Sequence, residues 1–304
     1  MKKFLLKIFL FFITFLLLIF IFFSSIEEQL AQDNFYFKFT TPKQSSMIIG
    51  TSRALQGLIP EIINKELNID IYNYAFTVMN SSYGPSYLKS IKKKLDKNSD
   101  DGIFILSVDP WCISTKFNPS DNLNLFRERD LFIHKLNFVN VNPNFEYLFK
   151  FSQTNDFYDL LNKNTTDPFA YLHKSGWLEI DIPMDSLNHI KRFNERIAHY
   201  NNNINLYTHS EIRISYLKKT IDYLNNYGKV YLVRLPVHPK MMEIENRFMK
   251  NFNKKIESII SDDVIYFDMN KSKNQYIYTD GNHLHKSSSA IVSKQISDLI
   301  KSRY

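Results

Sequence analysis

Cysteine occurs only once among the 304 residues, at Cys112. A single cysteine excludes a disulfide within the chain and any metal site built on cysteine ligands. Glycine is also scarce, with 7 residues, and the sequence contains no glycine-rich phosphate-binding loop and no HExxH pattern. Metal-ligand spacing is absent from the histidines His134, His173, His189, His199 and His209. We therefore predict a fold that depends on its apolar core, with no metal and no cofactor.

Charge gives little indication of a polyanionic partner. Basic residues exceed acidic ones by 7, but no basic stripe with interleaved aromatic residues is present. The short basic run at 89–97 is typical of the solvated face of a helix. These patterns exclude a nucleic-acid-binding class. Apolar residues make up 44% of the chain and charged residues 23%, a composition that can bury a core and is not typical of disorder.

One long hydrophobic run stands near the N-terminus. Ile8–Phe23 consists almost entirely of Phe, Leu and Ile, and with its flanks it approaches the ~20 residues that a membrane-spanning helix needs. We predict a cytoplasmic tip and transmembrane anchor at 1–26. Lysines precede the run and Glu27 and Glu28 follow it, so the positive-inside rule places 27–304 outside the cytoplasm, in the periplasm or extracellular space. A cleaved signal peptide is the alternative, but Ser24-Ser25 is a poor match to its cleavage site.

The rest of the chain alternates between short apolar runs and helical patterns. Residues 27–44 are polar and mixed, which predicts a stalk, and 45–304 form the predicted domain. Runs of strand length are Met47–Ile49, Ile69–Phe76, Ile103–Val108, Val230–Leu235 and Val264–Phe267. Helical spacing is found at Leu58–Leu67, Tyr87–Leu95, Ile212–Leu224, Ile244–Ile260 and Ile291–Ile300. This alternation predicts a parallel sheet covered by helices on both faces.

Residues 112–205 interrupt this alternation. They carry scattered aromatic residues, many asparagines and few clean periods. We interpret them as an insertion after the third strand, which packs over the carboxyl ends of the sheet as a lid or subdomain. Binding sites in open parallel sheets form at that same edge.

The end of the first predicted strand reads Gly50-Thr51-Ser52-Arg53. Ser52 then lies near the start of the next helix, where serine ordinarily serves as a cap. The same position can also hold a nucleophile, with a backbone N–H and the helix dipole near the developing oxyanion. The residue by itself leaves both interpretations open.

A distant segment supplies the partners that a serine nucleophile needs. Asp280 and His283 lie three residues apart, just before the last predicted helix. This spacing can bring the carboxylate to one ring nitrogen of His283 and leave the other nitrogen free to take a proton from Ser52. Both residues can also be plain turn and capping residues. His285 competes for the role of base but lies farther from Asp280.

Together these residues resemble the SGNH hydrolase superfamily. Gly50-Thr51-Ser52 matches its GDS-type block with Thr in place of Asp, and Asp280-Gly281-Asn282-His283-Leu284 matches its D-x-x-H block. The resemblance covers about 45–110 and 228–304. It implies a three-layer α/β/α flavodoxin-like fold and a Ser52–His283–Asp280 triad. The first block and the N-terminal anchor look most like a divergent membrane-anchored branch, which includes the D-alanyl-transfer and alginate O-acetylation proteins.

The two middle blocks depart from the superfamily pattern. Where it has a glycine whose N–H serves the oxyanion hole, this chain has Asn73 and Ala75, and Ala75 can still donate its N–H. Where it has an oxyanion-binding asparagine after the third strand, this chain has Asp109. An ionised aspartate only accepts hydrogen bonds, so Asp109 cannot replace that asparagine directly.

Four further residues are weaker candidates. Arg53 either holds a substrate carboxylate or phosphate or pairs with a neighbouring acid, and the sequence does not separate the two. Arg234 and His238 follow the fourth strand and either line the site or belong to a structural strand end at Pro236 and Pro239. Trp111 is more typical of core or lid packing than of a platform for a sugar ring.

The sequence therefore predicts an extracytoplasmic, serine-dependent O-acyl esterase or O-acyltransferase acting on a cell-envelope glycan or similar polymer. The resemblance also implies a multi-pass membrane acyl carrier as a partner. The alternative is a non-catalytic relative that keeps the scaffold and binds a glycan or an assembly partner, which Asp109 and the missing GDS acid favour.

Overall fold

A computed structural model describes residues 1–25, 35–151, 168–261, 263–271 and 275–303. At its centre lies a five-stranded sheet in which every neighbouring pair is parallel. The order of the strands is β2-β1-β3-β8-β9. Their bounds are β1 (Ser46–Ile49), β2 (Ile71–Asn73), β3 (Gly102–Ser107), β8 (Gly228–Arg234) and β9 (Ile265–Asp268). Counted among the sheet strands alone, this is the flavodoxin-like order 2-1-3-4-5. The predicted α/β fold is confirmed.

Successive side chains of the strands point to opposite faces of the sheet. In β3, Phe104 and Leu106 belong to one buried cluster, while Ile103 and Ile105 belong to the other. Both faces are therefore covered, which explains why these strands read as continuous apolar runs rather than as alternating ones.

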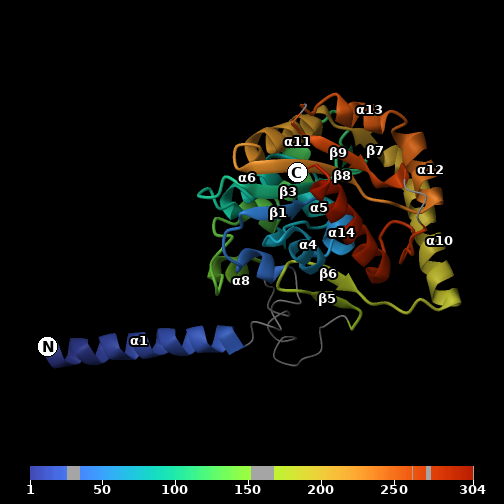
Figure 1. Ribbon diagram of the computed structural model, residues 1–304. Helices are drawn as coiled ribbons and strands as arrows, with labels where there is room; N and C mark the ends of the chain where they lie inside the picture. The colour runs from blue at the N-terminus through green and yellow to red at the C-terminus, as the bar shows by residue number, and fades with distance from the viewer. Residues whose placement is uncertain (26–34, 152–167, 262, 272–274, 304) are drawn as a thin grey trace.

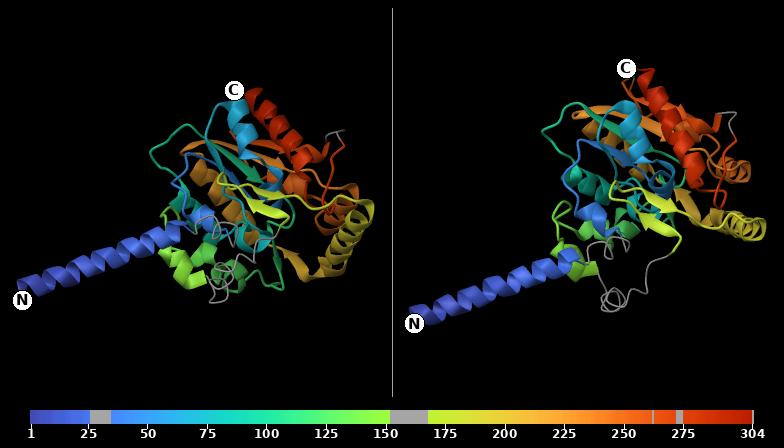
Figure 2. Two further views of the ribbon diagram at one scale, coloured as in Figure 1. Left: turned by 90° about the horizontal axis from the view of Figure 1, so that it is seen from below. Right: turned by 60° about the horizontal axis from the view of Figure 1, so that its bottom comes forward.

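Helices from different parts of the chain cover each face. One face is covered by α3 (Ser52–Gly57), α4 (Pro60–Leu67) and α14 (Lys286–Lys301). Figure 2 shows α4 and α14 side by side, consistent with their contacts. The other face is covered by α6 (Pro85–Lys94), α11 (Glu211–Leu224) and α13 (Phe252–Glu257).

Short elements complete this framework. They are α5 (Val78–Ser81), η4 (Ile204–Leu206), β7 (Tyr207–His209) and η5 (Met269–Lys271). The helix predicted at Ile244–Ile260 is in fact two helices, α12 (Pro239–Phe248) and α13. The chain leaves the helical conformation at Met249, whose φ and ψ are −143° and 74°, and Asn251 then precedes α13. The single-helix prediction was therefore wrong.

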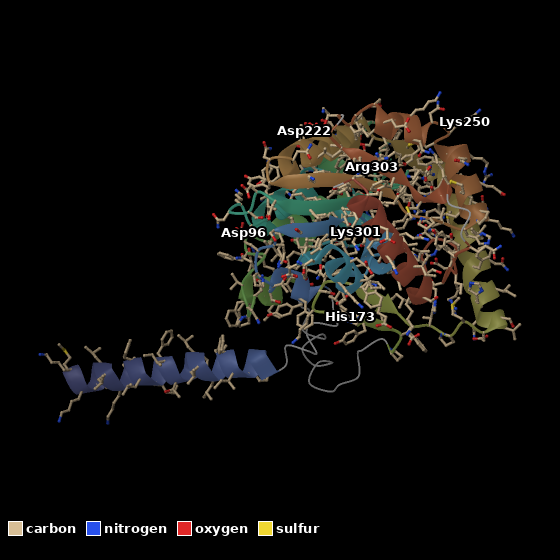
Figure 3. All side chains as sticks on the ribbon, viewed as in Figure 1. Asp96, His173, Asp222, Lys250, Lys301 and Arg303 are labelled. Atoms are coloured by element: carbon tan, nitrogen blue, oxygen red, sulfur yellow. The ribbon has the colours of Figure 1, made fainter. Side chains whose placement is uncertain are left out.

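The N-terminal helix α1 (Lys2–Ser25) stands apart from the sheet and its helices in every view (Figures 1 and 2). Its side chains are almost all hydrocarbon (Figure 3), and none of the span Lys2–Phe22 is buried. It is long and apolar enough to cross a membrane.

The predicted stalk at 27–44 is too long at its C-terminal end. The helix η1 (Tyr36–Phe39) is buried, and the ring of Tyr36 packs edge-on against Tyr147 at 5.6 Å between centroids. Gln44 forms a parallel bridge with Leu95 at the end of α6. These residues belong to the domain because their aromatic side chains are part of its core. The first part of the predicted stalk, up to residue 34, lies outside the described residues.

The described part of 112–205 contains both helices and strands. Its elements are β4 (Ser114–Lys116), η2 (Leu123–Leu125), η3 (Arg127–Arg129), α7 (Phe132–Lys135), α8 (Phe145–Phe151), β5 (Ala170–Leu172), β6 (Leu178–Ile180) and α10 (Ser186–Asn203). β4 pairs with β7, and β5 pairs with β6 as a hairpin. β6 contacts α3, and α10 contacts α12. The segment therefore reaches the edge of the sheet where the strands end.

Lys38 and Lys94 are buried in this core, and within the described part of the chain their hydrogen-bond acceptors include no carboxylate. Lys38 Nζ donates to the backbone oxygens of Asn73 and Gly176, at 2.5 and 2.6 Å. Lys94 Nζ donates to Thr41 O and Thr41 Oγ1, and to Val139 O, at 2.6 to 2.9 Å. Burial lowers the pKa of Lys94 to about 7, and burial together with the charge of Lys94 lowers the pKa of Lys38.

This burial makes stability depend on pH. Between pH 7 and the ordinary lysine pKa of 10.5, the unfolded chain holds a proton on Lys94 that the folded protein has lost. The free energy of unfolding should therefore rise as pH rises through this range, and Lys94→Met should reduce the slope. Urea unfolding at several pH values measures the slope of the free energy of unfolding against pH in the wild type and in Lys94→Met. Lys92→Met, on the exposed side of α6, is the matched control, and equal slopes in the two variants would contradict the prediction.

Candidate active site

Ser52 is placed by a tight turn at the end of β1. Gly50 has a φ of +153°, and a Cβ there would lie only 2.8 Å from the Cβ of Ser107. Glycine thus allows β1 to approach β3 closely and turn at once into α3. Ser52 is the first residue of α3, where a backbone N–H has no acceptor within the helix. Its side chain is half-buried.

Asp280 and His283 are held by a turn that closes on the Asp280 carboxylate. The backbone N–H groups of Asn282 and His283 donate to Asp280 Oδ1 at 3.0 and 2.9 Å. Gly281, which lies between Asp280 and Asn282, has a φ of +83°, a conformation that favours glycine. The imidazole Nδ1 of His283 then lies 3.0 Å from Asp280 Oδ2. The three-residue spacing therefore brings acid and imidazole together, as the sequence predicted.

The structure also brings this turn to the end of β1. His283 Nε2 lies 2.8 Å from Ser52 Oγ, although 231 positions separate the two residues. A hydroxyl, an imidazole and a carboxylate thus lie in one continuous hydrogen-bonded row. His285, the competing candidate, lies elsewhere: its Nδ1 caps α14 by accepting from the backbone of Ser287 at 3.3 Å.

The charge on Asp280 is stabilised from two sides. Burial alone would raise the pKa of Asp280, but the imidazole of His283 and the guanidinium of Arg196 lower it below its usual value. Arg196 belongs to α10 and its Nε donates to Asp280 Oδ2 at 2.8 Å. The carboxylate is therefore ionised at neutral pH and accepts hydrogen bonds only.

Arg53 pairs with a neighbouring acid, which is one of the two roles that the sequence left open. Its Nη2 lies 2.5 Å from Glu245 Oε1 and 2.7 Å from Asn282 Oδ1. Glu245 also accepts from Arg234 Nη2 at 2.9 Å and from Trp111 Nε1 at 3.0 Å. Burial alone would raise the pKa of Glu245, but the two guanidinium groups lower it. Arg234 and Trp111 are thus structural members of this buried network.

Asn73 and Ala75, the two predicted oxyanion-hole residues after the second strand, form hydrogen bonds with other groups of the protein. The Asn73 side chain donates to the backbone oxygens of Ala54 and Leu58, at 2.9 and 3.1 Å. Its Oδ1 accepts from the backbone N–H of Ala75 at 3.1 Å. Asn73 therefore ties α3 to β2, and the prediction that Ala75 offers a free N–H was wrong, because the side chain two residues earlier takes that hydrogen bond.

Asp109 turns its carboxylate into its own loop. Oδ1 accepts from the backbone N–H groups of Trp111 and Cys112, at 2.8 and 2.9 Å. Oδ2 accepts from Thr51 Oγ1 at 3.3 Å. Asp109 is buried, and it joins the loop after β3 to the residue before Ser52. It is thus a structural acceptor rather than a substitute for an oxyanion donor.

A cleft of about 400 Å³ opens beside His283 and Asp280. Gln56 of α3 lines one part of it, and Arg192, Glu195 and His199 of α10 line another. His238 does not line this cleft; it caps α12 by accepting from the backbone of Lys240. Within the described residues, no group of three or more His, Cys, Asp or Glu side chains is arranged to hold a metal ion.

Three residues of the site were missed in the sequence: Asn282, Glu245 and Arg196. The sequence does indicate that Glu245 is buried. Met241, Ile244 and Phe248 form an apolar stripe of helical spacing, and Glu245 lies in the same stripe. An acid in such a stripe needs a buried partner. Arg196 lies on a helix whose period was not recognised, and Asn282 reads as an ordinary turn residue.

No protein-family model and no curated protein matches the chain. Similar solved structures include a carbohydrate acetylesterase family member from Sinorhizobium meliloti, at 8% identity and a TM-score of 0.38, covering 84% of this chain and 97% of that chain. Est24, a carbohydrate acetylesterase from the same organism, has 10% identity and a TM-score of 0.38, covering 86% and 100%.

An aryl esterase from M. smegmatis, in an inhibitor-bound form, has 9% identity and a TM-score of 0.35, covering 84% of this chain and 98% of that chain. At such identities and TM-scores neither activity nor residue roles transfer to this chain. Its function is therefore inferred from the geometry of the site.

The buried network around Glu245 makes a stability prediction. Glu245→Gln removes the charged carboxylate that pairs with the buried guanidinium groups of Arg53 and Arg234, so the free energy of unfolding should fall by about 3 kcal/mol. Urea unfolding measures this change. Glu243→Gln removes an exposed acid from the same helix and should leave stability nearly unchanged. Equal stability of the two variants would rule out the network as a determinant of the fold.

Proposed function

We propose that this chain is a serine-dependent O-acyl esterase or O-acyltransferase. The observation that supports this is the row formed by Ser52 Oγ, the His283 ring and the Asp280 carboxylate, with contacts of 2.8 and 3.0 Å. A serine hydroxyl is a weak nucleophile unless a neighbouring base takes its proton, and an imidazole oriented by a carboxylate is such a base.

In the proposed reaction, Ser52 Oγ forms a bond to the acyl carbonyl carbon while His283 Nε2 takes its proton. Asp280 accepts the Nδ1–H hydrogen bond and stabilises the resulting imidazolium. The tetrahedral adduct collapses by releasing the alcohol, which receives the proton from Nε2. Water or a second alcohol then attacks the acyl-serine, with His283 again taking and returning the proton. Hydrolysis and transfer differ only in this acceptor.

The backbone N–H of Ser52 is the oxyanion donor that we assign. It lies next to the nucleophile and at the first position of α3, where it has no helical acceptor. The N–H of Ala75 is not part of this proposal, because Asn73 Oδ1 already accepts from it.

The proposed substrate is an acylated polymer, such as a glycan of the cell envelope. Helix α1 would anchor the chain in the membrane, with the lysines before it in the cytoplasm and the domain outside. The cleft beside His283 is lined by polar and charged side chains of α3 and α10 and by Ile180 and Ile182, a mixed lining that suits a sugar polymer with hydroxyl groups and apolar ring faces. A multi-pass membrane protein that supplies acyl groups is the partner implied by the resemblance to membrane-anchored SGNH proteins.

Covalent labelling tests the nucleophile. The full-length protein in detergent, treated with a serine-directed phosphonate, should gain one adduct by intact mass, and Ser52→Ala should gain none because the attacking oxygen is gone. Ser82→Ala, at a buried serine outside the row, is the control and should label like the wild type. An adduct that persists in Ser52→Ala would refute the assignment, and no adduct in any variant would favour a non-catalytic binding protein.

Kinetics on an aryl acetate test the base. His283→Ala should lower kcat by about 10²–10⁴-fold, because it removes the imidazole that is hydrogen-bonded to Ser52 Oγ. The melting temperature should change little. His285→Ala, which alters only the cap of α14, should retain most of the activity. A folded and fully active His283→Ala protein would eliminate His283 as the base.

A further inference from the structure

The side-chain amide of Asn282 lies between Arg53 and the imidazole of His283. Asn282 Oδ1 accepts from Arg53 Nη2 at 2.7 Å and from Arg53 Nε at 3.2 Å. Its Nδ2 lies 3.1 Å from His283 Nε2, the same nitrogen that faces Ser52 Oγ. Asn282 is buried, so water does not compete freely for these contacts.

Arg53 fixes which way this amide points. A guanidinium group only donates hydrogen bonds, so the amide oxygen must face Arg53 and the NH₂ group must face His283. Arg53 cannot turn away, because its Nη2 also donates to the fully buried carboxylate of Glu245 at 2.5 Å. A flipped amide would set NH₂ against two N–H groups of Arg53 and lose both hydrogen bonds.

The orientation of the amide constrains the protons on His283. An NH₂ group can only donate here, so its contact with Nε2 is favourable when that nitrogen offers its lone pair, which it then shares with the Ser52 hydroxyl, and the ring proton lies on Nδ1. That is the form in which Nδ1–H donates to Asp280 and Nε2 can accept a proton from Ser52. In the opposite tautomer and in the imidazolium, Nε2–H can donate to Ser52 Oγ but also lies against an NH₂ group that cannot accept it.

We propose that Asn282 is a positioning residue that holds His283 in the neutral form with Nε2 unprotonated. The inference rests on the proposed role of His283 as the base. When Nε2 takes the proton of Ser52, the contact with Asn282 turns unfavourable. The contact therefore also favours transfer of that proton to the departing alcohol, after which the resting hydrogen bonds form again.

Other charged groups around the ring act in both directions. Asp280, on the same loop, faces the ring at Nδ1, and Arg196 of α10 pairs with that carboxylate. Arg192, Glu195 and His199 of α10 line the cleft on the open side, and Arg53 of α3 and Glu245 of α12 lie behind Asn282. Asn282 is uncharged, so its effect on Nε2 comes from hydrogen-bond direction rather than from charge.

Nitrogen NMR of the ring tests the proposal without requiring turnover. The full-length protein is labelled with ¹⁵N-histidine and studied in detergent at about pH 7.5, which is above the ordinary histidine pKa of about 6.5. The His283 signals are assigned by their loss in His283→Gln. The wild type should show a protonated Nδ1 and an unprotonated Nε2. Asn282→Asp should show a proton on Nε2 as well, because its carboxylate accepts from both Arg53 and the ring. Asn282→Ala should show a reduced share of the Nδ1–H form.

Asn201→Asp is the matched control, since the exposed Asn201 also accepts from an arginine, Arg247, and should leave the His283 signals unchanged. On an aryl acetate, both Asn282 variants should lose about tenfold or more in kcat with KM nearly constant. Unchanged His283 signals in folded Asn282→Asp and Asn282→Ala would overturn the inference, even if the phosphonate labels Ser52. The predicted signals without any adduct would support the inference and reject the catalytic proposal.

Discussion

The ion pair between Arg53 and Glu245 is the interaction on which the geometry of the site depends. Arg53 follows Ser52 directly, and Asn282, which accepts from Arg53, precedes His283 directly. The two parts of the site are therefore joined through the neighbours of the reacting residues as well as through the 2.8 Å contact itself. A buried ion pair gains little net stability, because desolvation opposes the attraction of the charges. Its role here is to hold geometry, because the hydrogen bonds of Arg53 join α3 to α12 and to the 280–283 turn.

The topology of the sheet explains why such distant residues can meet. β1 lies between β2 and β3, and the chain reaches these two neighbours by crossovers on opposite sides, which leaves an opening at their carboxyl ends. Ser52 lies at that edge because α3 begins immediately after β1. The turn at 280–283 arrives there from β9 at the far edge of the sheet, just before α14 returns across the face that α3 and α4 also cover. One helix layer therefore supports both parts of the site.

The sequence was sufficient for the sheet and for the pairing of Asp280 with His283, because apolar runs and a three-residue spacing are local signals. It was not sufficient for residues whose role depends on a partner far along the chain. The error at Ala75 is of this kind, since nothing in the sequence shows that the Asn73 amide would turn back onto its N–H. Glu245 is another, because its place in an apolar stripe indicates burial but does not identify the two arginines from other elements that lie beside it. The predicted C-terminal boundary of the stalk was wrong because Tyr36 and Phe39 pack into a core formed by later parts of the chain.

The segment 112–205 contributes a side chain to the site itself and does more than cover it as a lid. Arg196 of α10 donates to the same carboxylate that orients His283, so the insertion contributes to the charge balance around the imidazole. The β5–β6 hairpin is joined to α3 as well, through Trp177 Nε1 and the backbone oxygen of Gln56 at 2.9 Å. Movement of this segment would therefore change the contacts that hold Asp280 and the helix α3, which begins with Ser52. Since the cleft is lined jointly by α3, α10 and the 279–283 turn, a substrate that contacts α10 would act directly on the residues that hold His283 in place.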